Sequence, residues 1–250
     1  MPDVVLVQGA SRGLGLAFVK RLIGPSAASK VIATCRDPNS ALALRELVES
    51  HPQRVTLLRL DVTDEDSLEA VAETVSAAGK PIDLLINCAG VLHSPEGLRP
   101  EKRLQDVCLN NLEQYFRINT IGPLMVAKHL VPLMTRRGRA IIANLSARVG
   151  SISDNRLGGW YGYRASKSAQ NMMTKTLSIE LKRTHPEMIC VGLHPGTVAT
   201  ELSAPFASRV DPEKLFSPEE AATKLLAVIE KLVPGDTGKI FAYDGSEVPS

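Results

Sequence analysis

Long apolar runs, aromatic side chains and net charge are all scarce in this chain of 250 residues. No apolar run reaches the roughly 20 residues that a membrane-spanning helix needs, so we expect no membrane segment. Because 29 Lys and Arg stand against 27 Asp and Glu, without a long basic run, we expect neither nucleic acid nor an anionic membrane as a partner. Aromatic residues make up 4% of the chain and are too scattered to define the shape of a substrate.

Cysteine is also scarce, with four residues that form neither a CxxC pair nor the spacing of a zinc site. We therefore expect reduced thiols and no metal centre, with Cys88 the thiol nearest to a functional site. The sequence enters a strand-like run directly, so we also expect no signal peptide and a cytoplasmic protein.

Short runs rich in Val, Ile and Leu alternate with longer amphipathic segments along the chain. The short runs are uniformly apolar, which is typical of a parallel sheet that is buried on both faces. The strand-like runs are Val4–Val7, Val31–Thr34, Val55–Leu60, Leu84–Ile86, Ala140–Leu145, Ile189–Leu193 and Ile240–Ala242. Helical patterns fall at 14–23, 40–50, 65–78, 105–134, 160–184 and 218–232.

A strand with its helix takes roughly 30 or more residues, so these runs use the whole chain. The pattern predicts an α/β fold over residues 1–250, a single Rossmann-type domain with a doubly wound parallel seven-stranded sheet and helices on both faces. In this fold ligands bind at the carboxyl ends of the strands. The segment 201–217 breaks the alternation, and we expect it to be a lid over the substrate site.

The segment from Trp160 to Lys182 carries Tyr163 and Lys167, four positions apart. On a helix this spacing puts the phenol and the ammonium on one face, within reach of the same point. A phenol has an ordinary pKa of about 10, and we expect the nearby cation to lower it towards neutral pH, where proton exchange is most effective. An isolated pair of this kind is more often an exposed Tyr beside a solvated Lys, so its meaning depends on the rest of the chain.

A glycine-rich loop follows the first strand-like run, with glycines at positions 9, 13 and 15. Glycine permits a positive φ and lets the backbone approach a pyrophosphate, which then lies at the N-terminus of the first helix. The spacing is GxxxGxG rather than the GxGxxG of the broader dinucleotide motif, and the alternative is a plain tight turn. The position of the loop between a strand and a helix favours nucleotide binding.

The choice of cofactor depends on Arg36 and Asp37, which follow the second strand-like run. An acidic residue there binds the ribose 2′-hydroxyl of NAD, whereas an Arg accommodates the 2′-phosphate of NADP. Arg36 comes first, and Arg12 of the glycine loop can converge on the same phosphate. Because Asp37 precedes Pro38 and a helix start, it is typical of a turn or cap residue. The sequence therefore favours NADP, with NAD as the alternative.

Two polar residues stand at the ends of other elements. Ser146 ends the fifth strand-like run, where a hydroxyl can donate a hydrogen bond to a carbonyl oxygen. Asn119 lies in an apolar helical turn, where its amide is either part of a site or satisfied by backbone. The Gly122-Pro123 step that follows predicts a kink in this helix.

Taken in order, these residues resemble the short-chain dehydrogenase/reductase family along essentially the whole chain. The matching features are the glycine loop, Asp61-Val62, Asn87-Cys88-Ala89-Gly90, Asn119, Ser146, Tyr163 with Lys167, and Pro195-Gly196. Within the family the chain is most similar to the sniffer-like and C-factor-like carbonyl reductases. The stretches that carry this likeness are Thr34-Cys35-Arg36, residues 158–169, Leu193-His194-Pro195-Gly196 and Tyr243-Asp244-Gly245.

The resemblance implies an NADPH-dependent reductase of ketones or aldehydes. It implies that Tyr163 donates the proton, that Lys167 holds the nicotinamide ribose, and that Ser146 bonds the substrate oxygen. Asn119 would hold a water between Lys167 and solvent. The implied cofactor-binding residues are Gly9, Ser11, Arg12, Gly13, Leu14, Gly15, Arg36, Asp61, Val62, Asn87, Ala89, Gly90, Tyr163, Lys167, Pro195, Gly196, Val198 and Thr200.

Two residues depart from the family pattern. Gln8 replaces the usual Thr, which puts one stabilising hydrogen bond in doubt, and Cys88 replaces the second Asn of the NNAG motif, with a loss of bonding between sheet and helix. Two other functions stay open, an NAD-dependent dehydrogenase of secondary alcohols and a dinucleotide-binding sensor without turnover. A homodimer or homotetramer could form through the helices at 105–134 and 160–184, or their apolar residues could face the chain's own sheet.

Overall fold

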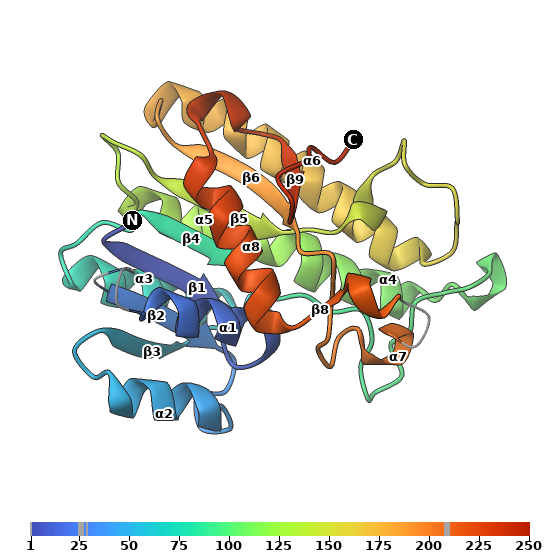
Figure 1. Ribbon diagram of the computed structural model, residues 1–250, viewed down its shortest axis with the longest axis horizontal. Coiled ribbons are helices and arrows are strands. Elements are labelled where there is room, and N and C mark those ends of the chain that lie inside the picture. The colour runs from blue at the N-terminus through green and yellow to red at the C-terminus, as the bar shows by residue number, and fades with distance from the viewer. Residues whose placement is uncertain (1, 25–27, 29, 208–210) are drawn as a thin grey trace.

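A seven-stranded sheet forms the centre of the molecule, in the order β3-β2-β1-β4-β5-β6-β9 with every neighbouring pair parallel (Figure 1). The computed structural model describes residues 2–24, 28, 30–207 and 211–250. The strands are β1 (Val4–Gln8), β2 (Lys30–Cys35), β3 (Val55–Arg59), β4 (Leu84–Asn87), β5 (Ile141–Leu145), β6 (Ile189–His194) and β9 (Ile240–Ala242). Each predicted run forms one of these strands, so the prediction of a seven-stranded parallel sheet is confirmed.

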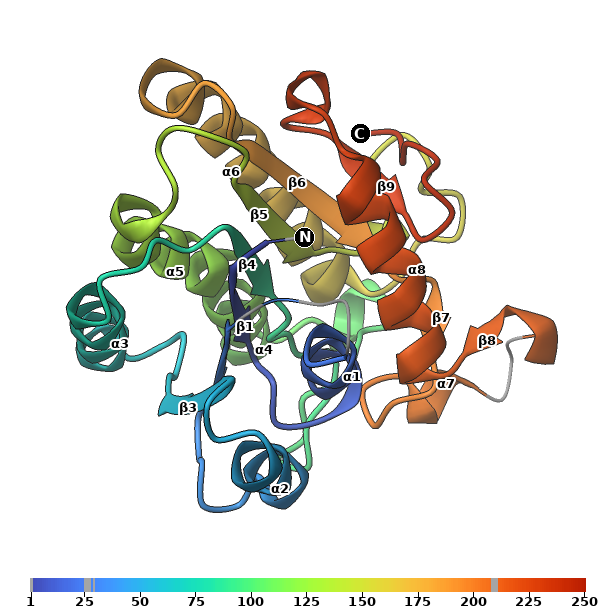
Figure 2. The ribbon, with the colours of Figure 1, turned by 60° about the vertical axis from the view of Figure 1, so that its left-hand side comes forward.

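Helices cover both faces of this sheet, which confirms the doubly wound α/β fold. Figures 1 and 2 show the two groups, with α1 (Gly13–Leu22), α2 (Leu42–Ser50) and α8 (Pro218–Lys231) on one face and α3 (Glu65–Ala77), α5 (Gly122–Leu130) and α6 (Tyr161–Thr184) on the other. None of the helices that the structure describes is both long enough and apolar enough to span a membrane.

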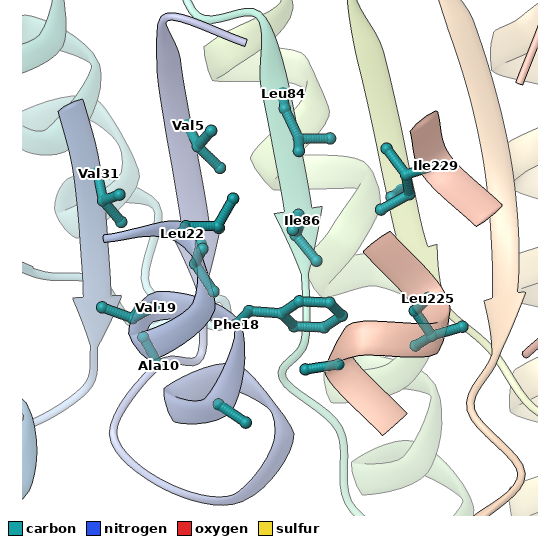
Figure 3. Close-up of a cluster of buried hydrophobic side chains, with 14 of the residues drawn as sticks. Val5, Ala10, Phe18, Val19, Leu22, Val31, Leu84, Ile86, Leu225 and Ile229 are labelled. Carbon is teal, nitrogen blue, oxygen red and sulfur yellow. The ribbon is translucent and has the colours of Figure 1, made fainter. Parts of the chain in front are cut away.

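The face under α1 and α8 is packed with apolar side chains. Phe18 of α1 is fully buried and lies between Ile86 of β4 and Leu225 of α8 (Figure 3). Every residue of β1 is buried, as expected for a central strand with helices above and below it. Complete burial of a Leu or Phe side chain contributes roughly 1.5–3 kcal/mol, so this face holds the sheet and its helices together.

The strand order reverses between β1 and β4. The chain runs outward from β1 through β2 to β3, and then returns to the other side of β1 to build β4, β5, β6 and β9. Because all these strands are parallel, the segments that follow them meet along one edge of the sheet. The glycine loop after β1 and the segment 88–90 after β4 therefore lie next to each other, at the point where doubly wound sheets bind their ligands.

The single helix predicted over 105–134 is wrong, because the structure divides this segment. Its elements are a 3₁₀ turn (Leu104–Asp106), α4 (Leu109–Phe116), a π-helical turn (Arg117–Ile121), α5 and a second 3₁₀ turn (Val131–Leu133). Pro123 has no N–H to donate to the carbonyl oxygen of Asn119, four residues earlier, so the regular α-helical ladder is interrupted there. The irregular turn lies directly before the Gly122-Pro123 step at which the sequence predicts a kink.

Two short strands outside the main sheet have no counterpart among the predicted runs. They are β7 (Thr197–Val198) and β8 (Leu215–Phe216), and they pair in parallel. Between them lie α7 (Ala204–Ala207) and a 3₁₀ turn (Pro212–Lys214), while residues 208–210 of the predicted lid lie outside the described residues. The pairing brings the end of the segment 201–217 back beside the chain that leaves β6.

Candidate active site

The glycine loop turns sharply between β1 and α1 because its glycines leave no room for side chains. Gly9 has a φ of 80°, and a Cβ on it would lie 2.7 Å from the amide nitrogen of Ala89. A Cβ on Gly15 would lie 2.2 Å from the carbonyl oxygen of Gly9. Arg12, the N-cap residue of α1, makes no side-chain capping bond, so the first N–H groups of the helix can bind an anion. This cradle of bare backbone fits the pyrophosphate of a dinucleotide.

Gln8 ties β1 to β4 beside this loop. Its Oε1 accepts a hydrogen bond of 3.0 Å from the backbone N–H of Ala89, and its carbonyl oxygen accepts one of 2.9 Å from the N–H of Cys88. The side chain of Gln8 thus supplies a bond at the position where the departure from the family pattern had put one in doubt. Cys88 interacts electrostatically with Lys167, which places this thiol next to the predicted catalytic residues.

The two arginines expected at a 2′-phosphate are both exposed. Arg12 donates a hydrogen bond to the carboxylate of Glu201, which links the glycine loop to the segment that follows β6. Arg36 follows β2 at the same edge of the sheet. Asp37 accepts a hydrogen bond of 3.0 Å from the N–H of Asn39, and hydrogen bonds from its own turn hold its pKa below the ordinary value. Asp37 is therefore a turn residue, as the sequence predicts.

Two predicted cofactor residues already have partners within the chain. Asp61 accepts hydrogen bonds from the N–H of Thr63 at 2.9 Å and from its hydroxyl at 2.8 Å. Asn87 donates from Nδ2 to Oδ1 of Asn144 at 2.8 Å, whereas its own buried Oδ1 has no partner among the described residues. A buried acceptor without a donor requires an explanation, and a ligand held at this edge would supply one.

Small residues bring the other predicted positions close together. A Cβ on Gly90 would lie 3.8 Å from Nζ of Lys167, and a Cβ on Gly13 would lie 3.3 Å from Cγ2 of Thr200. The segments after β1, β4 and β6 therefore meet around one volume of bare backbone. The remaining predicted cofactor residues follow β1, β3, β4 and β6 at the same edge: Ser11, Leu14, Val62, Ala89, Pro195, Gly196 and Val198.

Asn119 lies in the π-helical turn and is fully buried. Its Oδ1 accepts a hydrogen bond of 2.8 Å from the N–H of Val91, and its Nδ2 donates to the carbonyl oxygen of Val91 at 3.0 Å and to Oγ of Ser166 at 3.1 Å. The amide thus fixes the chain after β4 against α6. The amide of Asn119 is thus satisfied by the backbone of Val91 and the hydroxyl of Ser166, and its part in the site stays a prediction.

Ser146, Tyr163 and Lys167 are brought together where β5 ends and α6 begins, with 5%, 7% and 4% of their surfaces exposed. Nζ of Lys167 donates to the carbonyl oxygen of Leu145 at 2.7 Å and lies 6.0 Å from the centre of the Tyr163 ring. Ala147 packs in the same cluster as Tyr163. Because Leu145 and Ala147 flank Ser146, the serine lies in the chain between a partner of Lys167 and a neighbour of Tyr163. A common catalytic site of the three residues stays a prediction.

Burial sets the protonation of Tyr163 and Lys167. It raises the pKa of Tyr163 to about 12 and lowers the pKa of Lys167 to about 7, in both cases because the charged form loses its hydration. The expected lowering of the phenol pKa by the ammonium is therefore wrong for the protein alone, since burial of the phenol is the cause of the shift and acts in the opposite direction. Tyr163 is instead kept in its protonated form, which is the form that can donate a proton.

Two residues one turn beyond Lys167 bind the predicted catalytic side chains, and they were not singled out from the sequence. Oε1 of Gln170 accepts a hydrogen bond of 3.0 Å from Nζ of Lys167. Oδ1 of Asn171 accepts one of 2.6 Å from Oγ of Ser146. Both amides lie on the helix that carries Tyr163, three and four positions after Lys167, and this helical spacing is the signal that could have pointed to them.

Glu101 was also not predicted, although it accepts hydrogen bonds from the backbone at the start of α6. Its carbonyl oxygen accepts a hydrogen bond of 2.5 Å from the N–H of Trp160, and its Oε2 accepts one of 3.1 Å from the N–H of Gly162. Trp160 has a φ of 55°, and it is the one residue other than glycine with a positive φ among the described residues. A carboxylate at a helix N-terminus is stabilised by the helix dipole. No local pattern reveals Glu101, because its partners lie about 60 residues further along the chain.

An aromatic cluster surrounds Tyr163. The ring centres of Tyr115 and Trp160 lie 6.2 Å and 6.1 Å from that of Tyr163. The ring centre of Phe206, from the predicted lid, lies 5.0 Å from that of Trp160 and 6.1 Å from that of His93. Aromatic rings from four separate segments therefore join in one cluster with Tyr163.

One group of described side chains brings three possible metal ligands close together, Glu65, Glu69 and His129. Glu65 already accepts a hydrogen bond of 2.6 Å from Lys128 and lies 3.0 Å from Nε2 of His129. The lysine supplies the positive charge that a metal ion would otherwise bring. The absence of a metal centre stays a prediction.

Comparison with known proteins agrees with this geometry. The short chain dehydrogenase family model matches residues 3–211. The NADPH-bound carbonyl reductase from chicken fatty liver is 30% identical and superimposes with a TM-score of 0.88 over 99% of both chains. The carbonyl reductase Sniffer of Drosophila melanogaster is 29% identical, with a TM-score of 0.88 over 100% of both chains.

An uncharacterized oxidoreductase of Schizosaccharomyces pombe is 31% identical over 98% of this chain and 97% of its own. The resemblance found in the sequence is thus confirmed over nearly the full length of the chain. With its glycine loop and parallel sheet in place, the chain belongs to the short-chain dehydrogenase/reductase family of NAD(P)-dependent oxidoreductases.

Proposed function

We propose that this protein uses NADPH to reduce the carbonyl group of a small ketone or aldehyde, with Tyr163 as the proton donor. The observation that supports the proposal is the burial of Ser146, Tyr163 and Lys167, which lie where β5 ends and in the first turns of α6, at the edge of the sheet that holds the glycine loop. NADPH, when bound, would supply the hydride that adds to the carbonyl carbon. Tyr163 would give its phenolic proton to the carbonyl oxygen, which completes the alcohol.

The other residues of the site would orient the substrate and return the proton. Ser146 would donate a hydrogen bond to the carbonyl oxygen as negative charge develops on it. Lys167, with a pKa of about 7, can hold the nicotinamide ribose and restore the proton of Tyr163 near neutral pH. Because the amide of Asn119 is satisfied by Val91 and Ser166, a water that connects Lys167 to solvent would have to bind the main-chain carbonyl of Asn119.

The preference for NADPH over NADH rests on Arg12 and Arg36. A guanidinium group matches the geometry of a phosphate, and both arginines are exposed at the edge where β1 and β2 end. Asp37, which would favour NAD, is engaged in its own turn. The 2′-phosphate would take the place of Glu201 on Arg12. The NADPH bound to the carbonyl reductase from chicken fatty liver supports the same choice.

Three broader features belong to this proposal. Residues 1–250 would form a single catalytic domain, and the segment 201–217 would act as its lid, because Phe206 packs against Trp160 next to Tyr163. Apolar side chains of α6 such as Met172, which is 64% exposed, support a homodimer or homotetramer. A cytoplasmic location stays a prediction.

Replacing Tyr163 by Phe tests the proposal. We expect Tyr163→Phe to lower turnover by about two to four orders of magnitude, because it removes the general acid. Turnover is measured from NADPH consumption with a panel of ketones and aldehydes, and cofactor affinity from NADPH fluorescence. Tyr161→Phe is the matched control, since Tyr161 is 44% exposed and lies two residues away. Near-full turnover of Tyr163→Phe would contradict the mechanism.

The same measurements separate the two alternatives. An NAD-dependent dehydrogenase would oxidise secondary alcohols with NAD faster than it reduces carbonyl compounds with NADPH. A sensor would bind the dinucleotide but consume neither cofactor with any member of the panel. Titration of the protein with NADPH and with NADH measures the cofactor preference directly.

A further inference from the structure

The hydroxyl of Ser146 has one proton, and in this structure its hydrogen-bond acceptor is the side chain of Asn171 on α6. Oγ of Ser146 donates to Oδ1 of Asn171 over a short distance of 2.6 Å. A serine that donates to one acceptor cannot donate the same proton to a second acceptor. To stabilise a carbonyl oxygen, Ser146 must therefore release Asn171 or receive a hydrogen bond from it instead.

The amide of Asn171 can make this exchange without loss of another bond. Its Oδ1 is used by Ser146, whereas its Nδ2 makes no hydrogen bond to any residue that the structure describes. The two ends of the amide are nearly the same in size, so a rotation of the group exchanges an acceptor for a donor. Gly150 packs closely against this amide, since a Cβ on Gly150 would lie 3.2 Å from Nδ2. The amide group thus lies between Ser146 and Gly150.

We infer that Asn171 is a positioning residue that sets the direction of the Ser146 proton. When a carbonyl compound binds, the amide turns over, Nδ2 donates to Oγ of Ser146, and the Ser146 proton is directed to the substrate oxygen. A donor to Oγ also strengthens the bond that the hydroxyl donates, because hydrogen bonds in a chain polarise one another. The inference rests on the proposed reductase function, in which Ser146 donates to the carbonyl oxygen.

The test compares Asn171→Asp with Asn171→Leu, each in the natural background and combined with Ser146→Ala. An Asp carboxylate accepts hydrogen bonds but cannot donate, so it would keep the Ser146 proton and lower kcat by about 100-fold, as expected for loss of one donor to the developing oxyanion. A Leu side chain neither accepts a hydrogen bond from Ser146 nor donates one to it, and we expect a smaller decrease in kcat of about 3- to 10-fold. Asn110→Asp, on the exposed face of α4, makes the same chemical change as a control and should leave kcat unchanged.

The Ser146→Ala background separates the role of Asn171 from that of Ser146. If Asn171 acts through Ser146, neither substitution should lower kcat by more than about 2-fold once the hydroxyl is gone. Equal losses in both backgrounds would overturn the inference and leave the proposed function intact, because they would show that the Asp charge or the Leu side chain acts elsewhere. If Ser146→Ala itself keeps near-full turnover, the role of Ser146 in the proposed function fails and the inference fails with it.

NADPH fluorescence titration shows whether each variant is folded. If Asn171→Asp does not fold, the Leu variant decides the question. A loss that is confined to the natural background supports the inference, and a loss of the same size in both backgrounds overturns it.

Discussion

The helices α6 and α8 pack against opposite faces of the same sheet, but the chemistry of their buried faces differs. The buried residues of α8 are all apolar: Ala221, Ala222, Leu225, Val228 and Ile229. Those of α6 are mostly polar: Gly162, Tyr163, Ser166, Lys167, Gln170, Thr174, Ser178 and Leu181. The helix α8 stabilises the fold by burial, whereas α6 carries Tyr163 and Lys167, two of the predicted catalytic residues.

A polar buried face holds only if its groups find partners inside the protein. Oγ1 of Thr174 accepts a hydrogen bond from Asn144 at 2.9 Å and donates one to the carbonyl oxygen of Gln170 at 2.9 Å. Ser166 donates to the carbonyl oxygen of Tyr163 at 2.8 Å. The two helices thus bury different chemistry, and under the proposed function the polar groups of α6 serve the reaction.

The largest effect should come from the apolar helix. Leu225→Ala should lower the free energy of unfolding by about 2–5 kcal/mol, because it leaves a cavity under a fully buried side chain. Chemical denaturation measures the change. Leu157→Ala is the control, since Leu157 is 91% exposed. If both variants lost the same small amount, the apolar face would not be the main source of stability.

The polar helix should respond to loss of a single hydroxyl. Thr174→Val keeps the shape of the side chain but leaves Nδ2 of Asn144 without an acceptor, which should cost about 1–3 kcal/mol in unfolding free energy. The matched control is Thr223→Val on α8, where the exposed hydroxyl bonds the carbonyl oxygen of Glu219 within the helix. The comparison fails if the control loses as much stability as the buried variant.

Replacing Lys167 should raise the free energy of unfolding, unlike the two substitutions above. Its pKa is about 7 in the folded protein, against an ordinary value of 10.5, so the unfolded chain binds the proton more tightly. The native protein therefore gains stability as pH rises from about 7 towards 10.5. At pH 7 and below, Lys167→Met should be more stable than the natural protein by about 1–2 kcal/mol, while its activity is lost.

Denaturation curves of Lys167→Met and the natural protein, recorded between pH 6 and about pH 10, measure this difference. The gain should shrink steadily as pH rises. Lys175→Met, at an exposed position of the same helix, should show no such trend. A gain that did not depend on pH would mean that packing, and not the buried charge, was responsible.

The smallest effect should come from the start of α8. Oγ of Ser217 accepts a hydrogen bond from the N–H of Glu220 at 3.2 Å, and Oε2 of Glu220 accepts one from the N–H of Ser217 at 2.8 Å. Ser217→Ala should cost about 1 kcal/mol of unfolding free energy, and Ser217→Asn should restore most of it. Thermal unfolding distinguishes the two variants. Equal stability of the Ala and Asn variants would show that this cap contributes nothing.

The sequence predicts both helices, at 160–184 and 218–232, but a local pattern shows the cap of only the second. Ser217 and Glu220 lie within one turn of α8, so the capping pattern can be read locally. The corresponding carboxylate at α6 belongs to Glu101, on a loop before α4. The short strands β7 and β8 are likewise not predicted by a local pattern, because they form by pairing of segments that are distant in the chain.

The sequence by itself determined the strands, most of the helices, the glycine loop and the four-residue spacing of Tyr163 and Lys167, because each depends on periodicity or on neighbours within a few positions. The tertiary structure decided the hydrogen bond from Ser146 to Asn171, the one from the N–H of Ala89 to Gln8 and the raised pKa of Tyr163. These depend on which distant groups meet and on how completely they exclude water. Such contacts form when the sheet and its helices pack together, and no local pattern encodes them.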